Sequence, residues 1–315
     1  MRRILLTVCI ALSVSVGCKK ESTRPQIAVI PKGTTHEYWR SVDAGAEQAG
    51  KDLGVDIIWR GPLKEDDRAA QIQVVQQFVS NHVAGIVLAP LDNRGLLDPV
   101  QLAGSQNIPV VIIDSALEGQ VGKDFVSFVA TDNYKGGAIA GAELARVLDN
   151  KGKIVLLRYG EGSASTLDRE KGFLDEIAKH KEMQMLVSDR YAGATTDAAE
   201  KTALNMIDTI RQADGIFASN ESATAGMLAA LRTAGLAGKA KFVGFDATAA
   251  LIDALKNKDI NALVAQDPYH MGYEGVRVMV DHLNGKPVEQ RVDTGVHLIT
   301  LDNLNSPEIQ KLLTH

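Results

Sequence analysis

Short apolar runs alternate with amphipathic stretches along the chain from residue 26 onward. The run "QIAVIPK" at residues 26–32 predicts a strand, and residues 39–54 predict a helix because their apolar residues recur at spacings of three and four. A second apolar run, "VDIIWRG" at residues 55–61, predicts the next strand. These three segments together are typical of one β-α-β unit, in which a helix joins two parallel strands.

The same alternation continues to residue 268. Further helices are predicted at residues 68–83, 96–107, 134–150, 166–180, 196–210 and 221–235, with one more after residue 248. Further strands are predicted at residues 84–91, 108–115, 125–133, 152–160, 183–191, 214–220, 240–248 and 260–268. Strands that are apolar throughout indicate a parallel sheet covered by helices on both faces, so we predict an α/β protein with two doubly wound lobes in tandem.

Several predicted strands end on a polar residue. These residues are Asp114, Arg158, Asn220, Asp246 and Gln266. One such residue alone is most simply a turn residue or a helix cap. In doubly wound sheets, however, ligands bind beyond the carboxyl ends of the strands, where the loops converge. Five polar strand ends therefore predict a ligand site at this edge.

Composition and motifs narrow the class of function. The chain has 315 residues, of which 45% are hydrophobic, and a formal net charge of -5. A large core is therefore expected, and no basic surface suggests nucleic acid as a partner. No HExxH zinc motif or phosphate loop is present, and "GEGSAS" at residues 160–165 lacks the third glycine of a dinucleotide loop. We expect no metal and no cofactor.

The chain begins "MRRILLTVCIALSVSVGCKK", in which two arginines precede an uncharged run that is too short to span a bilayer permanently. Residues 1–17 predict an export signal. The ending "SVGC" resembles a bacterial lipobox, which implies lipidation of Cys18 as the mature N-terminus, although ordinary secretory cleavage nearby is the alternative. Residues 18–25 then form a lipidated polar leash, and the lipid is the only membrane contact that we expect.

The body of the chain resembles the ribose-type periplasmic sugar-binding proteins of ABC transporters, whose core is shared by the lactose-repressor family. The resemblance covers nearly all of residues 26–300. It rests on passages that include "GIVLAPLDNRGLLDPVQLAGSQNIPVVIIDS", "ATDNYKGGAIAGAELA", "GIFASNESATAGMLAALRTAG", "VGFDAT" and "ALVAQDPYHMGYEGV". It implies a periplasmic binding protein-like I fold of two lobes, joined by a hinge with three crossings, that close on a ligand.

Matching positions imply the ligand contacts. Tyr38 and Trp39 match the paired aromatics that sandwich a sugar ring, with core packing as the alternative, and His36 precedes them. The polar contacts implied by the match are Asp114 from the first lobe, Asn220 and Asp246 from the second, and Gln266 at a hinge. Carboxylates accept hydroxyl hydrogens and amides both donate and accept, which suits a polyhydroxylated ligand.

The chain departs from the ribose pattern at two arginines. Ser115 and Leu167 stand where the ribose binders have arginine. Arg169 remains, and its role is either structural or ligand binding. We hypothesise that Arg158, at a strand end, faces the cleft and replaces a lost donor. The charged stretch at residues 62–71 is interpreted as a solvated loop and helix start, with permease contact as the alternative.

We therefore predict an exported, monomeric solute-binding lipoprotein, in the periplasm or at the cell surface, that delivers a small sugar or polyol to an ABC permease. A ligand sensor that signals to a chemoreceptor or histidine kinase is the alternative. The predicted N-terminal lobe comprises residues 26–131 and 267–294, and the C-terminal lobe comprises residues 132–266 and 295–315. The protein is not expected to be an enzyme, because the family's carboxylates serve as hydroxyl acceptors rather than as a glycosidase pair.

Overall fold

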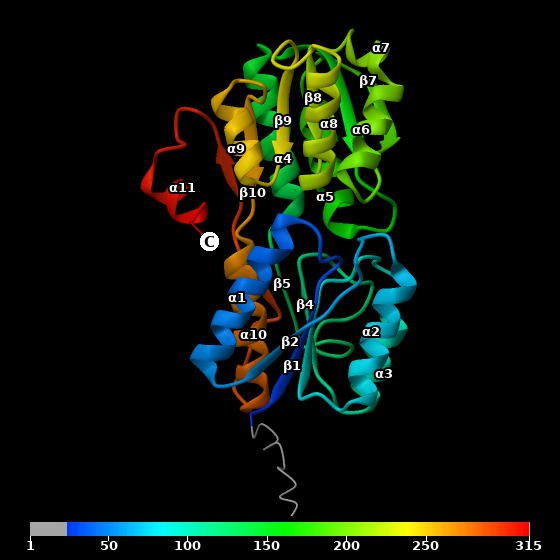
Figure 1. Cartoon of the computed structure of the whole chain (residues 1–315), viewed down its shortest axis with the longest axis vertical. Helices are drawn as coiled ribbons and strands as arrows, with labels where there is room; N and C mark the ends of the chain where they lie inside the picture. The colour runs from blue at the N-terminus through cyan, green and yellow to red at the C-terminus, as the bar shows by residue number, and fades with distance from the viewer. Residues whose placement is uncertain (1–23, 315) are drawn as a thin grey trace, which may run out of the picture.

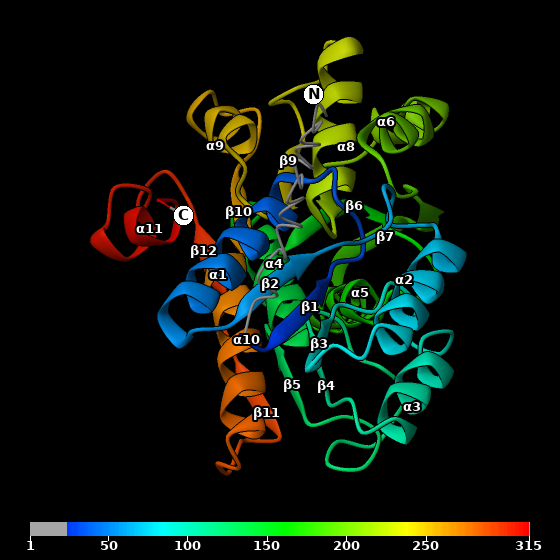
Figure 2. The same ribbon diagram turned by 60° about the horizontal axis from the view of Figure 1, so that its bottom comes forward.

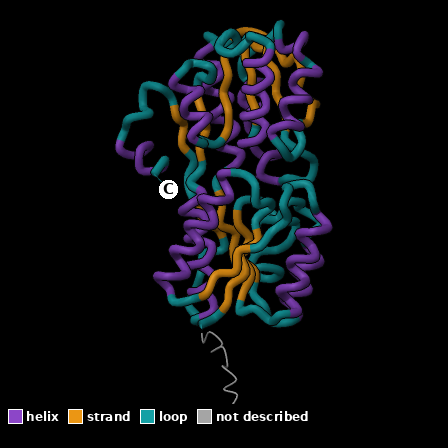
Figure 3. The backbone as a smooth tube through the Cα atoms, in the orientation of Figure 1, coloured by secondary structure: helices purple, strands orange, loops and turns teal. Residues whose placement is uncertain are grey.

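The computed structural model describes residues 24–314, which form two α/β lobes stacked one above the other in Figure 1. The expected export signal and Cys18 lie outside the described residues. In each lobe the strands lie in the middle and helices flank them, as Figure 3 shows. The predicted class of two doubly wound lobes is confirmed.

The lower lobe in Figure 1 contains a parallel sheet with the strand order β11-β5-β4-β3-β1-β2. Its strands are β1 (Gln26–Ile30), β2 (Asp56–Trp59), β3 (Gly85–Leu88), β4 (Val110–Ile113), β5 (Ser127–Ala130) and β11 (Arg291–Asp293). Helices α1 (Glu37–Leu53) and α10 (Pro268–Leu283) cover one face, and α2 (Arg68–Ser80) and α3 (Leu97–Ser105) cover the other. Figure 2 shows α1 and α10 side by side, with α2 and α3 across the sheet from them. This lobe is called the N-terminal lobe below.

The upper lobe, called the C-terminal lobe, has the strand order β12-β10-β9-β8-β6-β7. Its strands are β6 (Lys151–Arg158), β7 (Glu182–Tyr191), β8 (Gly215–Ala218), β9 (Lys241–Phe245), β10 (Ala262–Ala265) and β12 (His297–Ile299). Only the edge strand β12 runs antiparallel within this sheet as the structure describes it. The two sheets therefore share one strand order, in which β1 to β5 correspond to β6 to β10.

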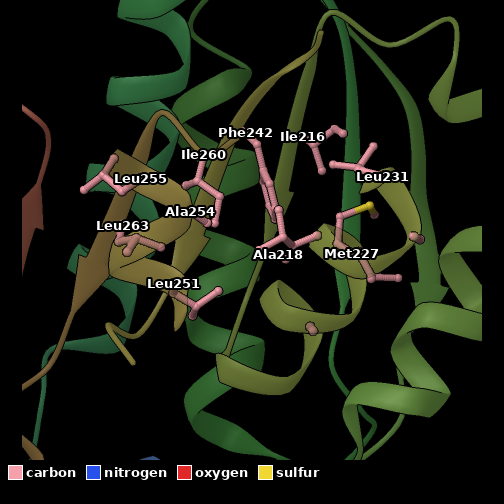
Figure 4. Packing of buried hydrophobic residues seen from close by; sticks show 14 of the residues in the cluster. Ile216, Ala218, Met227, Leu231, Phe242, Leu251, Ala254, Leu255, Ile260 and Leu263 are labelled. Carbon is pink, nitrogen blue, oxygen red and sulfur yellow. The ribbon is translucent and has the colours of Figure 1, made fainter. Parts of the chain in front are cut away.

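Helices α4 (Asn133–Val147) and α5 (Ala164–Ile177) cover one face of the second sheet. The other face carries α6 (Thr196–Asn205), α8 (Glu221–Thr233) and α9 (Ala249–Lys256). Figure 4 shows apolar side chains of α8 and α9 in one layer with Phe242 and Ile216. Helix α11 (Pro307–Leu312) joins this core through Ile309. The helix predicted at residues 196–210 is confirmed except for its continuity, because the structure divides it at Met206 into α6 and α7 (Ile207–Ile210).

One pair of helices in each lobe packs with almost no space between the backbones. A Cβ atom added to Gly272 of α10 would lie 2.0 Å from the carbonyl oxygen of Val42 in α1. A Cβ atom added to Gly172 of α5 would likewise lie 2.0 Å from the carbonyl oxygen of Tyr134 in α4. Only glycine permits this approach, so both lobes use the same device to hold their helix pair against the sheet.

The chain crosses between the sheets after β5, after β10 and between β11 and β12. Two of these crossings lie side by side, since the hydroxyl oxygens of Thr131 and Thr294 are 3.5 Å apart. Gln266 begins the third crossing directly after β10. The carboxyl ends of the parallel strands in both lobes are thereby turned toward the same boundary.

Candidate ligand-binding site between the lobes

A polar cavity lies at the boundary of the lobes, where the N-terminus of α1 faces the N-terminus of α8 (Figure 1). The N-terminal lobe contributes Lys32, His36, Tyr38, Trp39, Glu65 and Asp114 to its lining. The C-terminal lobe contributes Tyr159, Ser163, Ser165, Thr166, Arg169, Asn220, Glu221 and Asp246, and Gln266 lies at the crossing that follows β10. Both walls therefore carry groups that bind hydroxyls.

Two aspartates occupy equivalent places in the two lobes. Asp114 follows β4 with a φ of 63°, and Asp246 follows β9 with a φ of 69°. The backbone N–H of Asp114 donates to Val129 (3.1 Å), and that of Asp246 donates to Val264 (2.8 Å), which ties each turn to the neighbouring strand. Aspartate tolerates the left-handed region better than most residues, and backbone strain of this kind is common at functional sites. The turn ends the strand and aims the carboxylate into the cavity.

The carboxylate of Asp114 binds two partners from its own lobe. Its Oδ2 lies 2.7 Å from the Nζ of Lys32, and its Oδ1 accepts a hydrogen bond from the hydroxyl of Tyr38 (2.9 Å). The side chains of Lys32 and Asp114 are only 5% and 4% exposed. Lys32 also reaches the opposite lobe, where its Nζ donates to Ser165 (2.9 Å). A buried cation thus stands beside the first-lobe carboxylate.

Glu65 is the centre of a second buried cluster. One of its oxygens lies 2.9 Å from the Nδ1 of His36 and accepts from the indole N–H of Trp39. The other accepts from the hydroxyl of Tyr159 in the opposite lobe (2.5 Å). Burial opposes both charges, but the pairing outweighs it: the pKa of His36 rises to about 9 and the pKa of Glu65 falls to about 2. Both groups are charged at neutral pH.

The wall from the C-terminal lobe carries several hydroxyls, the amide of Asn220, the guanidinium of Arg169 and the carboxylates of Glu221 and Asp246. Asp246 accepts from the side chain of Gln266 (2.9 Å) and from the backbone N–H of Glu221 (2.9 Å). Burial raises the pKa of Asp246, because the charge of Arg169 and these two neutral donors offset only part of the lost hydration. Gln266 is 4% exposed, and its Oε1 has no hydrogen-bond partner among the described residues. Such a buried acceptor needs a hydrogen-bond donor.

Arg169 lines the cavity, yet residues around it hold its guanidinium. Its Nε donates to Asn133 (2.8 Å) and its Nη1 donates to the carbonyl oxygen of Ser219 (3.1 Å). The guanidinium also lies 3.9 Å from the ring centroid of Phe245. These contacts assign Arg169 a structural role in the wall, and they leave its ligand role a prediction.

Eight of the ten residues predicted for the site line this cavity. They are His36, Tyr38, Trp39, Asp114, Arg169, Asn220, Asp246 and Gln266. Ser115 lies next to it and accepts a hydrogen bond from the backbone N–H of Ser165 across the lobe boundary (3.1 Å). Arg158 does not face the cleft: its Nη1 pairs with Glu170 (2.9 Å) and its Nε donates to the carbonyl oxygen of Ser188 (2.6 Å). The orientation hypothesised for Arg158 is therefore corrected, since the buried Glu170 carboxylate competes for its charge.

Two residues missed by the sequence analysis stand close to strand ends. Lys32 lies two residues after β1, and Tyr159 follows β6 directly. The same strand-end argument that selected Asp114 would have found both. Lys32 thus places a cation beside Asp114 in a wall where the ribose binders have an arginine at the position of Ser115.

The interpretation of residues 62–71 as solvated is wrong for Glu65. Asp67 caps α2 by accepting from the backbone N–H of Ala70 (2.9 Å), but Glu65 turns inward and is 9% exposed. No local pattern distinguishes an inward glutamate from its exposed neighbours. Only the tertiary contacts with His36 and Tyr159 identify it.

The space left inside the cavity is small, about 30 Å³, whereas an adjoining chamber measures about 290 Å³. The two share Tyr38, Glu221, Asp246 and Gln266 as walls, and the chamber extends to α9 and α11. Sites for small molecules generally measure some 300–1,000 Å³. The cavity between the paired side chains is therefore too small for a molecule of this kind unless the lobes part or those side chains rearrange.

No group of three or more histidine, cysteine or acidic side chains within residues 24–314 is placed to hold a metal ion. Among the helices of the same residues, none is both long and apolar enough to cross a membrane.

Two lobes of one strand order, with a polar cavity between them and three crossings beside it, define a bilobed solute-binding protein. The family model described as "Periplasmic binding protein domain" matches residues 27–287, and the chain belongs to this family. The family and its relatives are substrate-binding transport proteins rather than enzymes, and membership implies an exported, periplasmic protein.

Relatives of known ligand and solved structures agree with this assignment. The D-ribose/D-allose-binding protein of Pseudomonas aeruginosa is 28% identical over 308 residues, which cover 94% of this chain and 96% of that protein. A carbohydrate transporter solute-binding protein from Agrobacterium radiobacter, in complex with D-arabinose, is 34% identical with a TM-score of 0.88, over 93% of this chain and 99% of that one. A solute-binding protein from Agrobacterium vitis with bound D-fucose is also 34% identical, with a TM-score of 0.88, over 91% and 99%.

Proposed function

We propose that this protein is a solute-binding lipoprotein that captures a small sugar or polyol between its lobes and delivers it to an ABC permease. The observation that carries the proposal is the cavity itself, in which buried carboxylates from both lobes meet the amides of Asn220 and Gln266. The unpartnered Oε1 of Gln266 supports a ligand that donates hydrogen bonds. The sugars bound by the relatives from Agrobacterium support the same ligand class.

The side chains divide the recognition between them. Tyr38 provides aromatic surface for the apolar face of a sugar ring, whereas Trp39 is 2% exposed and packs in the core of its lobe, so its stacking role stays a prediction. Asp114, Asp246 and Asn220 face hydroxyls, with the carboxylates accepting and the amide both donating and accepting. We interpret the present contacts between these groups as pairings that the ligand hydroxyls replace. A neutral ligand fits, because Lys32 and His36 already have carboxylate partners.

Capture requires the lobes to open and close about the three crossings. Residues near Thr131, Gln266 and Thr294 absorb the rotation, as few-residue hinges do in other bilobed binding proteins. A ligand that contacts both lobes stabilises the closed form by its differential affinity for it. The permease then recognises the closed shape.

Export and anchoring complete the proposal. Residues 1–17 direct secretion, and a lipid on Cys18 holds the domain at a membrane surface through residues 18–25. Membership of a periplasmic family supports export. Metabolic labelling with a radioactive fatty acid tests the anchor: label is expected in the natural chain and absent from Cys18→Ser, and no incorporation in either chain contradicts it.

A thermal-shift screen tests the binding function. The chain is mixed with D-ribose, D-allose, D-arabinose, D-fucose and a set of polyols, each from low micromolar to millimolar concentration. A ligand that binds only the folded protein stabilises it by about 2.7 kcal/mol at one hundred times its Kd, which raises the Tm. The same ligand is expected to leave the Tm of Asp246→Asn unchanged. A flat response across sugars and polyols contradicts the proposed ligand class.

A further inference from the structure

Helix α1 begins at the cavity without a cap of its own. Its N-cap residue, His36, has extended backbone angles (φ -78°, ψ 150°), but its side chain makes no capping hydrogen bond. The ring pairs with Glu65 instead. The first backbone N–H groups of a helix have no partner within the helix, so those of Glu37 and Tyr38 depend on an external acceptor.

Glu221 supplies that acceptor from the opposite lobe. Its Oε1 accepts from the backbone N–H of Glu37 (3.1 Å), and its Oε2 accepts from that of Tyr38 (2.9 Å). Glu221 is the first residue of α8, and 183 residues separate it from Tyr38 in sequence. A carboxylate at a helix N-terminus also gains from the positive end of the helix dipole, so the contact is favourable beyond its two hydrogen bonds.

The backbone of Glu221 continues the connection into the C-terminal wall. Its N–H donates to Oδ2 of Asp246 (2.9 Å), whose Oδ1 accepts from Gln266 (2.9 Å). A continuous chain of hydrogen bonds thus connects Tyr38 on one wall with Asp246 on the other and with Gln266 at the crossing after β10. Burial raises the pKa of Glu221, as expected for a carboxylate withdrawn from water between two packed surfaces.

We propose that Glu221 is a positioning residue that sets how readily the lobes close, by capping α1 of the N-terminal lobe from α8 of the C-terminal lobe. This inference rests on the proposed binding function. When the lobes part, both hydrogen bonds break, and the start of α1 loses its cap. The loss falls on the open form alone, so Glu221 favours the closed form before any ligand arrives. Through its side chain and its backbone N–H, Glu221 also links the backbone of Tyr38 to the carboxylate of Asp246.

Small-angle X-ray scattering of the protein, dialysed free of sugar, tests the inference without knowledge of the ligand. The variant Glu221→Gln keeps the shape but loses the charge, and Glu221→Asp keeps the charge but is one methylene too short to reach both N–H groups. Each is expected to lower the closed-to-open ratio about tenfold, in line with the loss of a helix cap, and to increase the radius of gyration. The matched control is Glu308→Gln, because Glu308 pairs only with His297 among the described contacts of its own lobe.

Circular dichroism checks that each variant is folded, so that an increased radius reports opening. Radii of both Glu221 variants equal to those of the natural chain and of Glu308→Gln would overturn the inference. This holds also if all of these radii correspond to the open form, because the contact of Glu221 with α1 would then not keep the natural chain closed. Failure of the binding function has a different signature: no sugar or polyol would change the Tm of the natural chain, whatever the scattering shows.

Discussion

The two walls of the cavity have the same backbone geometry at their aspartates, but the groups around the two carboxylates differ. Asp114 and Asp246 follow corresponding strands, and both adopt positive φ angles. Asp114 is neutralised by Lys32 at 2.7 Å, whereas the bonds described for Asp246 come from an amide and a backbone N–H. One fold repeated in a chain thus fixes where a carboxylate points, while its neighbours decide whether its charge is stabilised.

The largest effect is expected at the ion-paired wall. Asp114→Asn keeps the shape of the side chain and tolerates the left-handed backbone, but it leaves Lys32 buried without its nearest anion. Removing one partner of a buried pair typically costs about 3–5 kcal/mol of unfolding free energy, and we expect the lower end here because Ser165 still accepts from Lys32. Urea denaturation measures this change.

The matched control for this variant is Asp149→Asn. Asp149 also has a positive φ, of 52°, but it lies exposed in a loop. The control should change the unfolding free energy little. If both substitutions proved equally mild, the distinction between the two walls would fail.

The next effect concerns the pair of His36 and Glu65 and depends on pH. The raised pKa of His36 stabilises the fold fully below about pH 6.5, and the contribution is lost as pH rises to about 9. The lowered pKa of Glu65 adds stability above about pH 4.5 that is lost as pH falls toward 2. His36→Gln is therefore expected to cost most between pH 4.5 and 6.5, about 3 kcal/mol, and much less at pH 9.

Thermal unfolding of His36→Gln and of the natural chain across this pH range gives the difference directly. His270→Gln is the control, because His270 lies exposed on α10. A difference that stays constant from pH 5 to pH 9 would show that His36 contributes through its shape rather than its charge.

Sequence patterns predicted what depends on local periodicity and on strand ends. Apolar runs and helical spacings were enough for the two-lobe class, and Asp114, Asn220 and Asp246 stand at strand ends as expected. The sequence did not predict that Glu65 points inward, because its direction is set by partners that are distant in sequence. The orientation predicted for Arg158 was wrong because the strand-end argument places a residue at an edge of the sheet without saying which neighbour attracts its side chain. Glu170, in the helix α5 that follows, pairs with it.

The helix pairs provide a test in which the lobes should behave alike. Gly172→Ala and Gly272→Ala each place a methyl group against a backbone carbonyl oxygen, which forces the paired helices apart. Overpacking of this kind costs about 1–3 kcal/mol, and we expect similar values for both, measured by urea denaturation. Gly104→Ala, near the end of α3, meets no atom within 4 Å and should instead stabilise slightly. A cost confined to one lobe would break the correspondence.

The smallest change in stability is expected at Asp246, which forms no ion pair among the described residues and feels the charge of Arg169 only at longer range. In Asp246→Asn, the side-chain oxygen can accept from the Glu221 N–H, and the new amide can donate to Gln266, whose Oε1 has no partner among the described residues. The unfolding free energy should change by less than about 1 kcal/mol, as for most substitutions that leave no polar group unpaired.

The direction of the pH dependence makes this last prediction specific. A carboxyl group whose pKa is raised by burial contributes stability at low pH that is lost as pH rises through that pKa. The amide in Asp246→Asn does not titrate, so the stability of this variant relative to the natural chain should increase between pH 4 and pH 7. Thermal melts at these two values, with Asp149→Asn as control, measure the difference. A relative stability that falls with pH would mean that the Asp246 charge is stabilised as well as that of Asp114, and the two walls would then be electrostatically alike.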